Sequence, residues 1–375
     1  MTKRTKLLIV AGARPNFMKV APLIKAIPAF NQRQPASAPA MEFRLVHTGQ
    51  HYDPLMSDIF FQELGIPAPD INLGVGSGSH ASQTANIMIG FEQACLEQKP
   101  DWVIVVGDVN STVACTLVGA KLGIRVAHVE AGLRSFDRTM PEEINRLATD
   151  AIADLLLTPS PDANENLGRE GVAPARIKLV GNIMIDSLCA NLAMARASRI
   201  LATLNIRPGE FIYVTLHRPA NVDHRESLTA IMAEFNRIGA RFPIIFPMHP
   251  RTRKMVAEFG LAQTDSTAIR IVEPIGYYDS LCLTENARVV LTDSGGLQVE
   301  STYFQTPCLT LRPNTERPVT ITVGSNKLTD VRALPADFEM ALAGPRRAGR
   351  IPELWDGHTA TRILDALAGF TPPAA

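Results

Sequence analysis

Three carboxylate side chains lie at the ends of expected buried strands or at the start of an expected helix. Asp108 ends the apolar run WVIVVGD, Glu130 follows the apolar run RVAHV, and Glu142 comes directly after Pro141, which suits a first helical turn. A carboxylate at the end of a buried strand needs a partner or a function, because burying an unpaired charge is expensive. If they meet in one cleft, the three carboxylates form an acid/base set.

The expected helix start also offers a purely structural role for its acidic residues. Negative side chains in a first helical turn offset the helix dipole by roughly 0.3–1 kcal/mol. Glu142 lies four residues before Arg146, the spacing of a surface ion pair. We assign Glu143 to this structural role alone. For Glu142 both roles stay open, because a positive helix end would also hold its carboxylate ionised.

A second group of residues could bind an anion. The segment LTDSGGLQVEST has the order strand, glycine turn, helix, with Ser294, Gly295 and Gly296 at the turn. Glycines let a ligand approach the backbone, and the free N–H groups of a helix start suit a diphosphate. An ordinary tight turn with Ser294 as helix cap is the structural alternative. Glu300 on the helix and Arg317 beyond the next apolar run strengthen the binding interpretation.

Three further polar residues follow apolar runs or lie on the helices after them. Arg14 ends the run KLLIVAGAR, and Lys19 lies on the helix expected after it, so both could meet a phosphate at that helix start. His217 ends the run FIYVTLH and could donate to a phosphate oxygen or move a proton. A solvated lysine and a capping histidine are the structural alternatives.

The elements that position these residues are short apolar runs alternating with segments of helical period. The runs are rich in Val, Ile and Leu without alternation, which is typical of strands buried on both faces. They are residues 6–12, 42–49, 102–108, 125–132, 154–160, 177–182, 211–217, 243–249, 269–274, 288–293 and 307–312. Such alternation predicts an α/β fold with parallel sheets covered by helices.

About eleven strands in 375 residues predict two doubly wound domains rather than one sheet. We place the first domain at residues 1–187 and the second at 188–356, with a short helix near the C-terminus. Ligands of open parallel sheets bind at the carboxyl ends of the strands. Two such sheets facing each other would make a cleft lined from both sides by the polar residues above.

Composition excludes several classes of function. The 37 basic and 37 acidic residues balance, which gives no electrostatic argument for nucleic acid or an anionic membrane surface. Five scattered cysteines without a CxxC pair fit a reduced, cytoplasmic protein and argue against a metal site. No apolar run approaches a signal peptide or a membrane span. No GxGxxG motif follows a strand, so a nicotinamide cofactor is not expected.

The sequence as a whole resembles the non-hydrolysing UDP-N-acetylglucosamine 2-epimerases. Eight motifs carry the resemblance, in family order over about residues 7–325: GARPNFMKVAPL, HTGQHYD, VVGDVNST, AHVEAGLRSFDRTMPEEINR, GNIMIDSL, TLHR, LTDSGGLQVE and NTERPVT. The resemblance implies two Rossmann-like domains facing across a cleft in the glycosyltransferase-B arrangement. It implies that a helix at about 357–370 packs back on the first domain, and that the protein is a homodimer without a cofactor.

The family's functional residues carry over to single positions of this sequence. Its catalytic groups fall on Asp108, Glu130, Glu142 and His217. Its substrate-binding groups fall on Arg14, Lys19, Ile275, Ser294, Gly295, Gly296, Glu300 and Arg317. The second domain would bind UDP, with the Ser294–Gly296 turn on phosphate, Glu300 on the ribose hydroxyls and Ile275 on the base. Gln50, His51 and His249 fall near the place where many relatives bind a second UDP-GlcNAc as an allosteric activator.

Two positions depart from the family pattern. Asn16 stands where the family often has Glu, and Ser280 stands where it often has a Phe near uracil. Neither departure touches the expected chemistry, but both bear on substrate detail.

The implied reaction is reversible inversion at C2 of UDP-GlcNAc to UDP-ManNAc, for cell-surface polysaccharide precursors. The C2 proton is not beside a carbonyl, and no nicotinamide is expected to oxidise a neighbouring carbon. Elimination of UDP to 2-acetamidoglucal and re-addition is therefore the sensible route. Proton transfer on opposite faces needs two groups, and the sequence leaves base and acid unassigned among the three carboxylates.

Other functions stay open at this point. A 2-epimerase for another UDP-2-acetamido sugar, such as UDP-2,3-diacetamido glucuronate, suits the same motifs. A hydrolysing epimerase would release free ManNAc and UDP. A glycosyltransferase of the same architecture would need an acceptor, and a nucleotide-sugar sensor would bind UDP without turnover.

Overall fold

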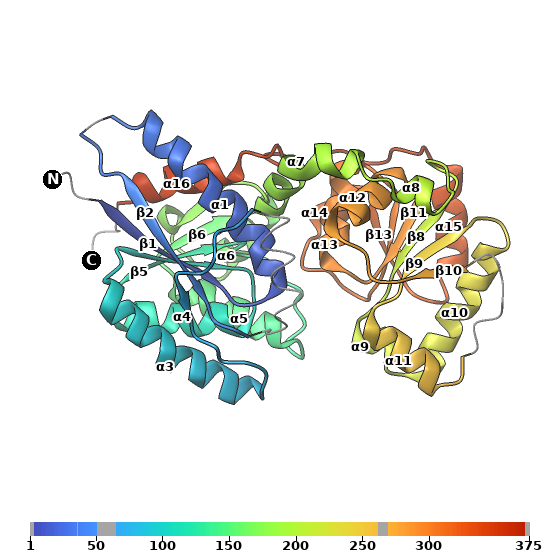
Figure 1. Cartoon of the computed structure of the whole chain (residues 1–375), viewed down its shortest axis with the longest axis horizontal. Helices are drawn as coiled ribbons and strands as arrows, with labels where there is room; N and C mark the ends of the chain where they lie inside the picture. Colours follow the sequence, from blue (N-terminus) through green and yellow to red (C-terminus); the bar gives the residue numbers. More distant parts are fainter. Residues whose placement is uncertain (1–3, 36, 51–64, 262–268, 372–375) are drawn as a thin grey trace. The chain divides into compact units, whose positions relative to one another are not determined.

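Two compact units make up the chain, and Figure 1 shows the elements of each. The computed structural model describes residues 4–35, 37–50, 65–261 and 269–371, with only the backbone of Arg14 and Pro15. Unit 1 comprises Met1–Ser187 and Glu353–Ala375, and unit 2 comprises Leu188–Pro352. The chain thus returns to unit 1 slightly before the position of about 357 expected from the sequence.

Unit 1 is built on a seven-stranded sheet in the order β3-β2-β1-β4-β5-β6-β7. All its described strand pairs are parallel. The strands are β1 (Thr5–Ala11), β2 (Met41–His47), β3 (Ile71–Asn72), β4 (Trp102–Val106), β5 (Arg125–Val129), β6 (Leu155–Thr158) and β7 (Ile177–Leu179). The strand order reverses between β1 and β4, where open parallel sheets bind ligands.

Helices connect these strands and cover the sheet. They are α1 (Arg14–Arg33), α3 (His80–Gln98), α4 (Asn110–Lys121), α5 (Pro141–Ile152), α6 (Pro161–Arg169), the 3₁₀ turn η1 (Pro174–Arg176) and α16 (Thr359–Ala368). Helix α7 (Ile183–Arg196) begins in unit 1 and continues beyond Ser187 into the chain of unit 2. Side chains of β1, β4 and β5 pack against apolar residues of α3 and α4 in one core. Figure 1 shows α3, α4 and α5 together, and α1 beside α16.

The C-terminal segment is anchored to unit 1 by polar contacts. The Asp186 carboxylate accepts hydrogen bonds from the backbone N–H groups of Thr359 (3.0 Å) and Ala360 (2.7 Å) at the start of α16. The buried Trp355 indole donates to the carbonyl of Pro159 at 3.1 Å. A carboxylate at a helix start satisfies free N–H groups and complements the dipole. These contacts tie α16 to the end of the unit 1 chain.

Unit 2 repeats the design with a six-stranded parallel sheet in the order β10-β9-β8-β11-β12-β13. The strands are β8 (Ile212–Thr215), β9 (Ile244–Pro247), β10 (Ile269–Val272), β11 (Val289–Thr292), β12 (Cys308–Leu311) and β13 (Asn326–Thr329). The helices are α8 (Ile200–Thr203), α9 (Pro219–Val222), α10 (Arg225–Gly239), α11 (Pro250–Glu258), α12 (Tyr277–Asn286), α13 (Gly295–Phe304), α14 (Val319–Thr322) and α15 (Leu334–Ala343). The strand order reverses between β8 and β11.

Helices cover both faces of the unit 2 sheet. Alternate residues of β8, such as Ile212 and Val214, pack against α10 and α15 in one core. The residues between them, including Tyr213, pack against α12 and α13 in a second core. Period-two alternation of a strand explains the division, because successive side chains point to opposite faces.

The fold class predicted from the sequence is confirmed: there are two parallel sheets with alternating helices, in two Rossmann-like units. Each of the eleven apolar runs coincides with a strand to within one residue at its start. The sequence missed β3, which has two residues, and β13, whose sequence NKLT lacks an apolar run. Within the described ranges, no helix is both long and apolar enough to cross a bilayer.

Candidate active site

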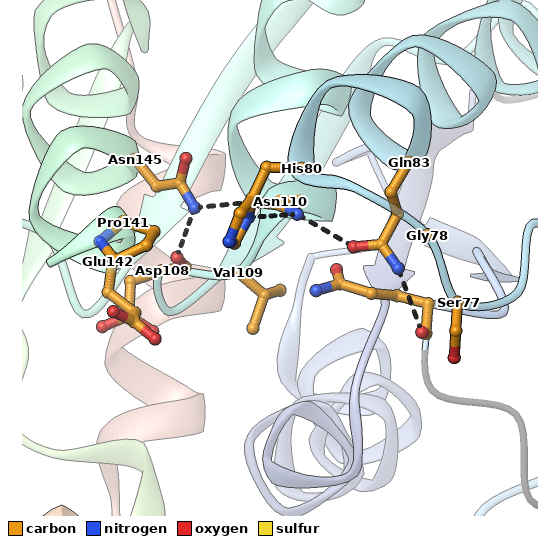
Figure 2. Close-up of a pocket in the computed structure, with 11 residues that line it drawn as sticks. Ser77, Gly78, His80, Gln83, Asp108, Val109, Asn110, Pro141, Glu142 and Asn145 are labelled. Carbon is orange, nitrogen blue, oxygen red and sulfur yellow. Dashed lines mark hydrogen bonds between the residues drawn. The ribbon is translucent and has the colours of Figure 1, made fainter. Parts of the chain in front are cut away.

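Asp108 and Glu142 line one pocket of about 300 Å³ in unit 1 (Figure 2). Its wall consists of Gln50, Ser77, Gly78, His80, Gln83, Asp108, Val109, Asn110, Pro141, Glu142 and Asn145. Three helix starts contribute to this wall, those of α3, α4 and α5. Free backbone N–H groups at helix starts give such a pocket a positive polarity that favours polar or anionic ligands.

Polar side chains of the pocket wall are bound to one another. Asn110 donates to Gln83 Oε1 at 2.8 Å and lies 3.1 Å from His80 Nδ1. The Gln50 side chain is held by Ser111: Gln50 Oε1 accepts from the Ser111 hydroxyl at 2.7 Å and from the Ser111 backbone N–H at 3.1 Å. Figure 2 shows this chain of amides and imidazole running along the pocket wall. The network gives the pocket a fixed set of polar groups.

Contacts with residues of α5 hold Asp108 in place. Gly107, with φ of 69°, turns the chain after β4 and places Asp108 at the pocket. The Asn145 amide donates to the Asp108 carbonyl at 2.9 Å, and Arg146 forms an ion pair with the Asp108 carboxylate. The expected pair of Glu142 with Arg146 is wrong, because the Arg146 guanidinium turns inward to Asp108 and Glu143.

Glu143 is not the surface helix-dipole residue expected from the sequence. It is 1% exposed, and its carboxylate accepts from the backbone N–H groups of Ser135 (3.0 Å) and Phe136 (2.9 Å) and from Arg146 (2.5 Å). Burial opposes ionisation, but these hydrogen bonds and the Arg146 charge outweigh it and lower the pKa of Glu143. Glu143 therefore joins the loop after Glu130 to the helix that carries Glu142.

Glu130 and Lys19 form a buried ion pair beneath the same turn. They are 4% and 6% exposed, so Lys19 is not the solvated side chain of the structural alternative. A β-carbon at Gly107 would lie 2.7 Å from Lys19 Nζ, so glycine makes room for the ammonium. Glu130 itself has φ of 69°, a conformation that costs a non-glycine residue roughly 1–3 kcal/mol and concentrates at functional sites.

Two predicted residues of unit 1 are only partly or not at all described. Arg14 is the first residue of α1, directly after β1, and its side chain is not described. His51 lies outside the described residues.

His217 and Asp293 form the centre of the polar edge of unit 2. His217 Nδ1 lies 3.0 Å from Asp293 Oδ1, and the His217 ring is 5.7 Å from the ring of His249. Asp293 is fully buried and also accepts from the backbone N–H of Arg218 (2.8 Å) and from Asn221 (3.1 Å). Burial opposes its ionisation, but the His217 hydrogen bond and charge outweigh it and lower the pKa of Asp293.

The glycine turn of unit 2 begins a helix beneath two arginines. Ser294 occupies the cap position of α13, but its side chain makes no capping hydrogen bond. A β-carbon at Gly295 would lie 2.8 Å from Arg317 Nη1 and 2.9 Å from Glu316 Oε1. Glycine therefore lets the Arg317 guanidinium lie against the helix start. Gly296 is the next residue of α13.

Glu316 lies between Arg312 and Arg317. Its carboxylate accepts from Arg312 Nη2 at 2.9 Å and contacts Arg317 Nη1. Burial opposes ionisation, but the attraction of Arg317 and Arg312 outweighs it and holds the pKa of Glu316 well below its usual range. The Arg317 guanidinium thus lies both beside Glu316 and against the start of α13. The arrangement suits a phosphate.

Glu300 is a buried carboxylate on the same helix. It is 7% exposed, and no hydrogen bond or ion pair to it is found among the residues the structure describes. Burial raises its pKa to about 8. The buried Tyr277 hydroxyl on neighbouring α12 likewise has no hydrogen-bond partner in the described part of the chain. Ile275, just before α12, packs on the core beneath. Polar groups left unpaired in this way suit the hydroxyl groups of a ligand.

The comparisons with known proteins agree on one family. A family model described as UDP-N-acetylglucosamine 2-epimerase matches residues 33–368. The chain belongs to this epimerase family. The UDP-N-acetylglucosamine 2-epimerase of Methanococcus maripaludis is 42% identical over 330 residues, which are 86% of this chain and 87% of that protein. The UDP-2,3-diacetamido-2,3-dideoxy-D-glucuronate 2-epimerase of Pseudomonas aeruginosa is 40% identical over 327 residues, 86% of this chain and 88% of that protein.

A solved structure extends the likeness to the fold. The crystal structure of the Methanocaldococcus jannaschii UDP-GlcNAc 2-epimerase in complex with UDP-GlcNAc and UDP has a TM-score of 0.86 and 41% identity, covering 97% of this chain and 99% of that one. Since epimerases are isomerases, the chain is an enzyme of the isomerase class. The resemblance to the epimerase family seen in the sequence is thereby confirmed.

Both departures from the epimerase family pattern have structural roles in this member. Asn16 Oδ1 accepts from the backbone N–H groups of Gly12 (3.0 Å) and Ala13 (2.9 Å), and its Nδ2 donates to the Val106 carbonyl at 3.0 Å. Asn16 therefore ties the end of β1 to the end of β4. Ser280 Oγ lies 2.9 Å from the Tyr213 hydroxyl, so a polar pair stands where many epimerases have an aromatic ring.

Three residues of this epimerase site escaped the sequence analysis as functional residues: Arg146, Asp293 and His128. Asp293 follows β11 directly, the same signal that identified Asp108 and Glu130. His128 lies inside a buried strand, and its Nε2 is 2.8 Å from the Gly107 carbonyl. A polar side chain within an apolar run was the available signal for it. Among the described side chains, no cluster of three or more His, Cys, Asp or Glu is arranged to hold a metal.

Proposed function

We propose that this protein reversibly epimerises UDP-GlcNAc at C2, giving UDP-ManNAc, by elimination and re-addition of UDP without hydrolysis. The observation that carries the proposal is the joining of Asp108 and Glu142 in one pocket; the Glu130–Lys19 pair does not line this pocket but lies beside Gly107, the residue before Asp108. The named activity of the relatives supports the substrate. A set of acids for proton transfer is what inversion at a C–H centre requires.

The nucleotide is assigned to residues of unit 2. The start of α13 and Arg317 would hold the diphosphate, because the N–H groups of a helix start and a guanidinium lie together there. Glu300, buried without a described partner, would accept the ribose hydroxyls. His217 would donate to the oxygen on which UDP departs, with Asp293 holding its ring. Ile275 would contact the base through its backbone.

The chemical step is assigned to the carboxylates of unit 1. One carboxylate takes the C2 proton, the C2–H electrons form the C1=C2 double bond, and the C1–O electrons leave with UDP. This step gives 2-acetamidoglucal. A second carboxylic acid then delivers a proton to the other face of C2 while the UDP oxygen attacks C1. Asp108 and Glu142, which line the pocket, and the buried Glu130 are the carboxylates from which both groups come.

The decisive experiment follows C2 in deuterated water. Incubated with UDP-GlcNAc and no added NAD, the enzyme should form UDP-ManNAc that carries deuterium at C2. Asp108→Asn, Glu130→Gln and Glu142→Gln should each lower turnover while the protein stays folded. Absence of both epimer and exchange, also when UDP-GlcNAc is raised to serve as activator, would refute the proposal. Free ManNAc with stoichiometric UDP would instead identify a hydrolysing enzyme.

A second substrate is favoured by one observation, the 40% identity to the Pseudomonas aeruginosa enzyme named for UDP-2,3-diacetamido-2,3-dideoxy-D-glucuronate. That sugar carries an acetamido group at C3 and a carboxylate at C5. Turnover of both nucleotide sugars should be compared under the same conditions. A kcat/KM higher for UDP-GlcNAc supports the first proposal, and the reverse order replaces it with the second. Transfer of the sugar to an acceptor without C2 exchange would indicate a glycosyltransferase.

The assembly and the setting are further parts of the proposal. We infer a homodimer in the cytoplasm, with UDP-GlcNAc as an allosteric activator and a product that serves cell-surface polysaccharide precursors. Helix α3 exposes Ile89 (71%) and Leu96 (53%) seven residues apart, hence on one face, and we assign the dimer contact to it. Light scattering on Ile89→Glu should report a monomer, and an unchanged dimer would exclude this face.

A further inference from the structure

We propose that Arg146 is the positioning residue of this enzyme: it fixes Asp108 in one orientation and holds a positive charge against it, which makes Asp108 the proton acceptor of the resting enzyme. This inference rests on the proposed epimerase function, because it assigns a role within that reaction. It concerns a residue that the sequence analysis had placed in an ordinary surface ion pair.

The Arg146 guanidinium joins two carboxylates from a buried position. Its side chain is 2% exposed. Nη1 contacts Asp108 Oδ2, while Nε and Nη2 donate to Glu143 Oε2 at 2.9 and 2.5 Å. Nη2 also lies 3.3 Å from Ser135 Oγ. A planar guanidinium with donors in fixed directions can serve both carboxylates at once, whereas a lysine ammonium is a single point charge.

Glu143 determines the orientation of the Arg146 guanidinium. Both Glu143 oxygens accept hydrogen bonds from the loop backbone, from Ser135 (3.0 Å) and Phe136 (2.9 Å). Its position is therefore determined by the main chain rather than by a flexible side chain. Because the main chain fixes Glu143, the Arg146 guanidinium bound to it is also fixed, including the Nη1 group that contacts Asp108.

Described residues bind the Asp108 carbonyl and one of its two carboxylate oxygens. Its carbonyl accepts from Asn145, and the carbonyl before it, of Gly107, lies 2.8 Å from His128 Nε2. Arg146 binds Oδ2. No described residue makes a hydrogen bond to Oδ1, and the side chain, 30% exposed, lines the pocket. One oxygen is thus held by a cation, and the other is available to a substrate proton.

The cation also distinguishes Asp108 from Glu142 in the same pocket. Glu142 is exposed, and no basic side chain that the structure describes forms an ion pair with it. Without Arg146, Glu143 and Asp108 would face each other as two like charges. Because Arg146 binds Asp108 Oδ2 and the Asp108 side chain lines the pocket, we assign the acceptor role to Asp108 and the proton transfer on the opposite face to Glu142.

The test measures kcat, KM for UDP-GlcNAc and the thermal unfolding midpoint of Arg146→Lys, Arg146→Gln and Glu143→Gln. Loss of orientation should lower kcat by about 10-fold in R146K and on the order of 10²-fold in R146Q, with E143Q between wild type and R146Q. KM should stay within about threefold, because Arg146 does not line the pocket. R146K should retain more activity than R146Q, since it keeps the charge.

Glu170→Gln is the matched control. Glu170 also binds a buried arginine of unit 1 through both oxygens, at 2.7 Å each, but that arginine, Arg134, makes no contact with a proposed catalytic carboxylate. E170Q should keep kcat within about twofold and lower the unfolding midpoint less than E143Q does, because the Glu170 side chain is 34% exposed. An equal fall in kcat for E170Q and E143Q would mean that both act through stability, and would overturn the inference.

A double-variant cycle gives the sharpest readout. If Arg146 acts only through Asp108, D108N/R146K should be no slower than D108N alone. Multiplicative effects would show that Arg146 acts elsewhere and would overturn the inference. Should R146Q not fold, R146K, E143Q and the cycle still decide the question. If wild type shows neither epimerisation nor C2 exchange, the proposed function fails; if wild type is active and R146K and E143Q match it, the positioning role alone fails.

Discussion

His217 Nδ1 lies 3.0 Å from the carboxylate of Asp293, and the two residues follow adjacent strands, β8 and β11, at the point where the strand order of unit 2 reverses. Asp293 is fully buried and its pKa is lowered, so it accepts a proton from Nδ1 rather than giving one. Nε2 of the 41% exposed His217 then faces solvent or ligand. The pair is built to hold one ring orientation.

Asp293→Asn should therefore lower kcat by roughly 10²-fold, because an amide can stabilise the wrong ring tautomer and removes the compensating charge. UDP affinity, measured by calorimetry, should change much less than kcat. His217→Gln in the same series should be at least as slow as D293N. A D293N enzyme with wild-type kcat would show that the pair has no part in turnover.

Glu300 predicts a dependence of stability on pH. Its folded pKa of about 8 lies above the ordinary value of 4.5, so the folded protein binds a proton that the unfolded chain releases. The corresponding stability is fully present below pH of about 4.5 and is lost as pH rises through about 8. Between these two pH values, the free energy of unfolding should fall less in Glu300→Gln than in the wild type. The difference between the two falls should be a few kcal/mol. Parallel pH curves for both proteins, from urea unfolding, would contradict the burial of an unpaired carboxylate.

Gly295→Ala should weaken UDP binding by about 10-fold. The added methyl group would lie 2.8 Å from Arg317 Nη1 and 2.9 Å from Glu316 Oε1, so the guanidinium must leave the start of α13. The site then loses a charge-assisted hydrogen bond to phosphate, worth roughly 1.5–3 kcal/mol. Calorimetry with UDP and with uridine separates the phosphate from the nucleoside: only UDP should lose affinity. Equal losses for both ligands would place the effect elsewhere.

Gly168→Ala is the control for that substitution. Gly168 is also a helical glycine, in α6, and a β-carbon added there would meet no heavy atom within 4 Å outside its own helix turn. Replacement should leave UDP affinity unchanged and raise stability by up to about 1 kcal/mol, because alanine restricts the unfolded chain.

Lys19→Met should destabilise unit 1 by about 3–5 kcal/mol, since it removes one partner of a buried ion pair with Glu130. Lys19→Met with Glu130→Gln should recover part of that loss, because no charge then remains buried. The free energy of unfolding, from urea titration, distinguishes the two variants. A double variant less stable than K19M alone would show that Glu130 has its principal partners elsewhere.

The sequence by itself was sufficient for the fold class and for several site residues. Buried parallel strands must be continuously apolar, and their carboxyl ends must meet at one sheet edge, so each run could be located and the polar residue after it suspected. Asp108 was found in this way and Glu142 from its place after Pro141 at a helix start, and the two do share a pocket. The strand β13 was missed because NKLT is not an apolar run.

Only the tertiary structure decided which charges are partners. Spacing along one helix favoured Glu142 for Arg146, but the guanidinium turns to Glu143 and to Asp108, thirty-eight positions earlier in the chain. Lys19 could have been solvated, yet it pairs with Glu130 beneath a glycine turn. Local sequence shows only which residues are neighbours on one element. A buried charge is stable only beside an opposite charge, which offsets its loss of hydration and can come from a distant part of the chain. Which residues become partners therefore depends on how the strand ends converge in the folded protein, and sequence spacing alone does not determine that.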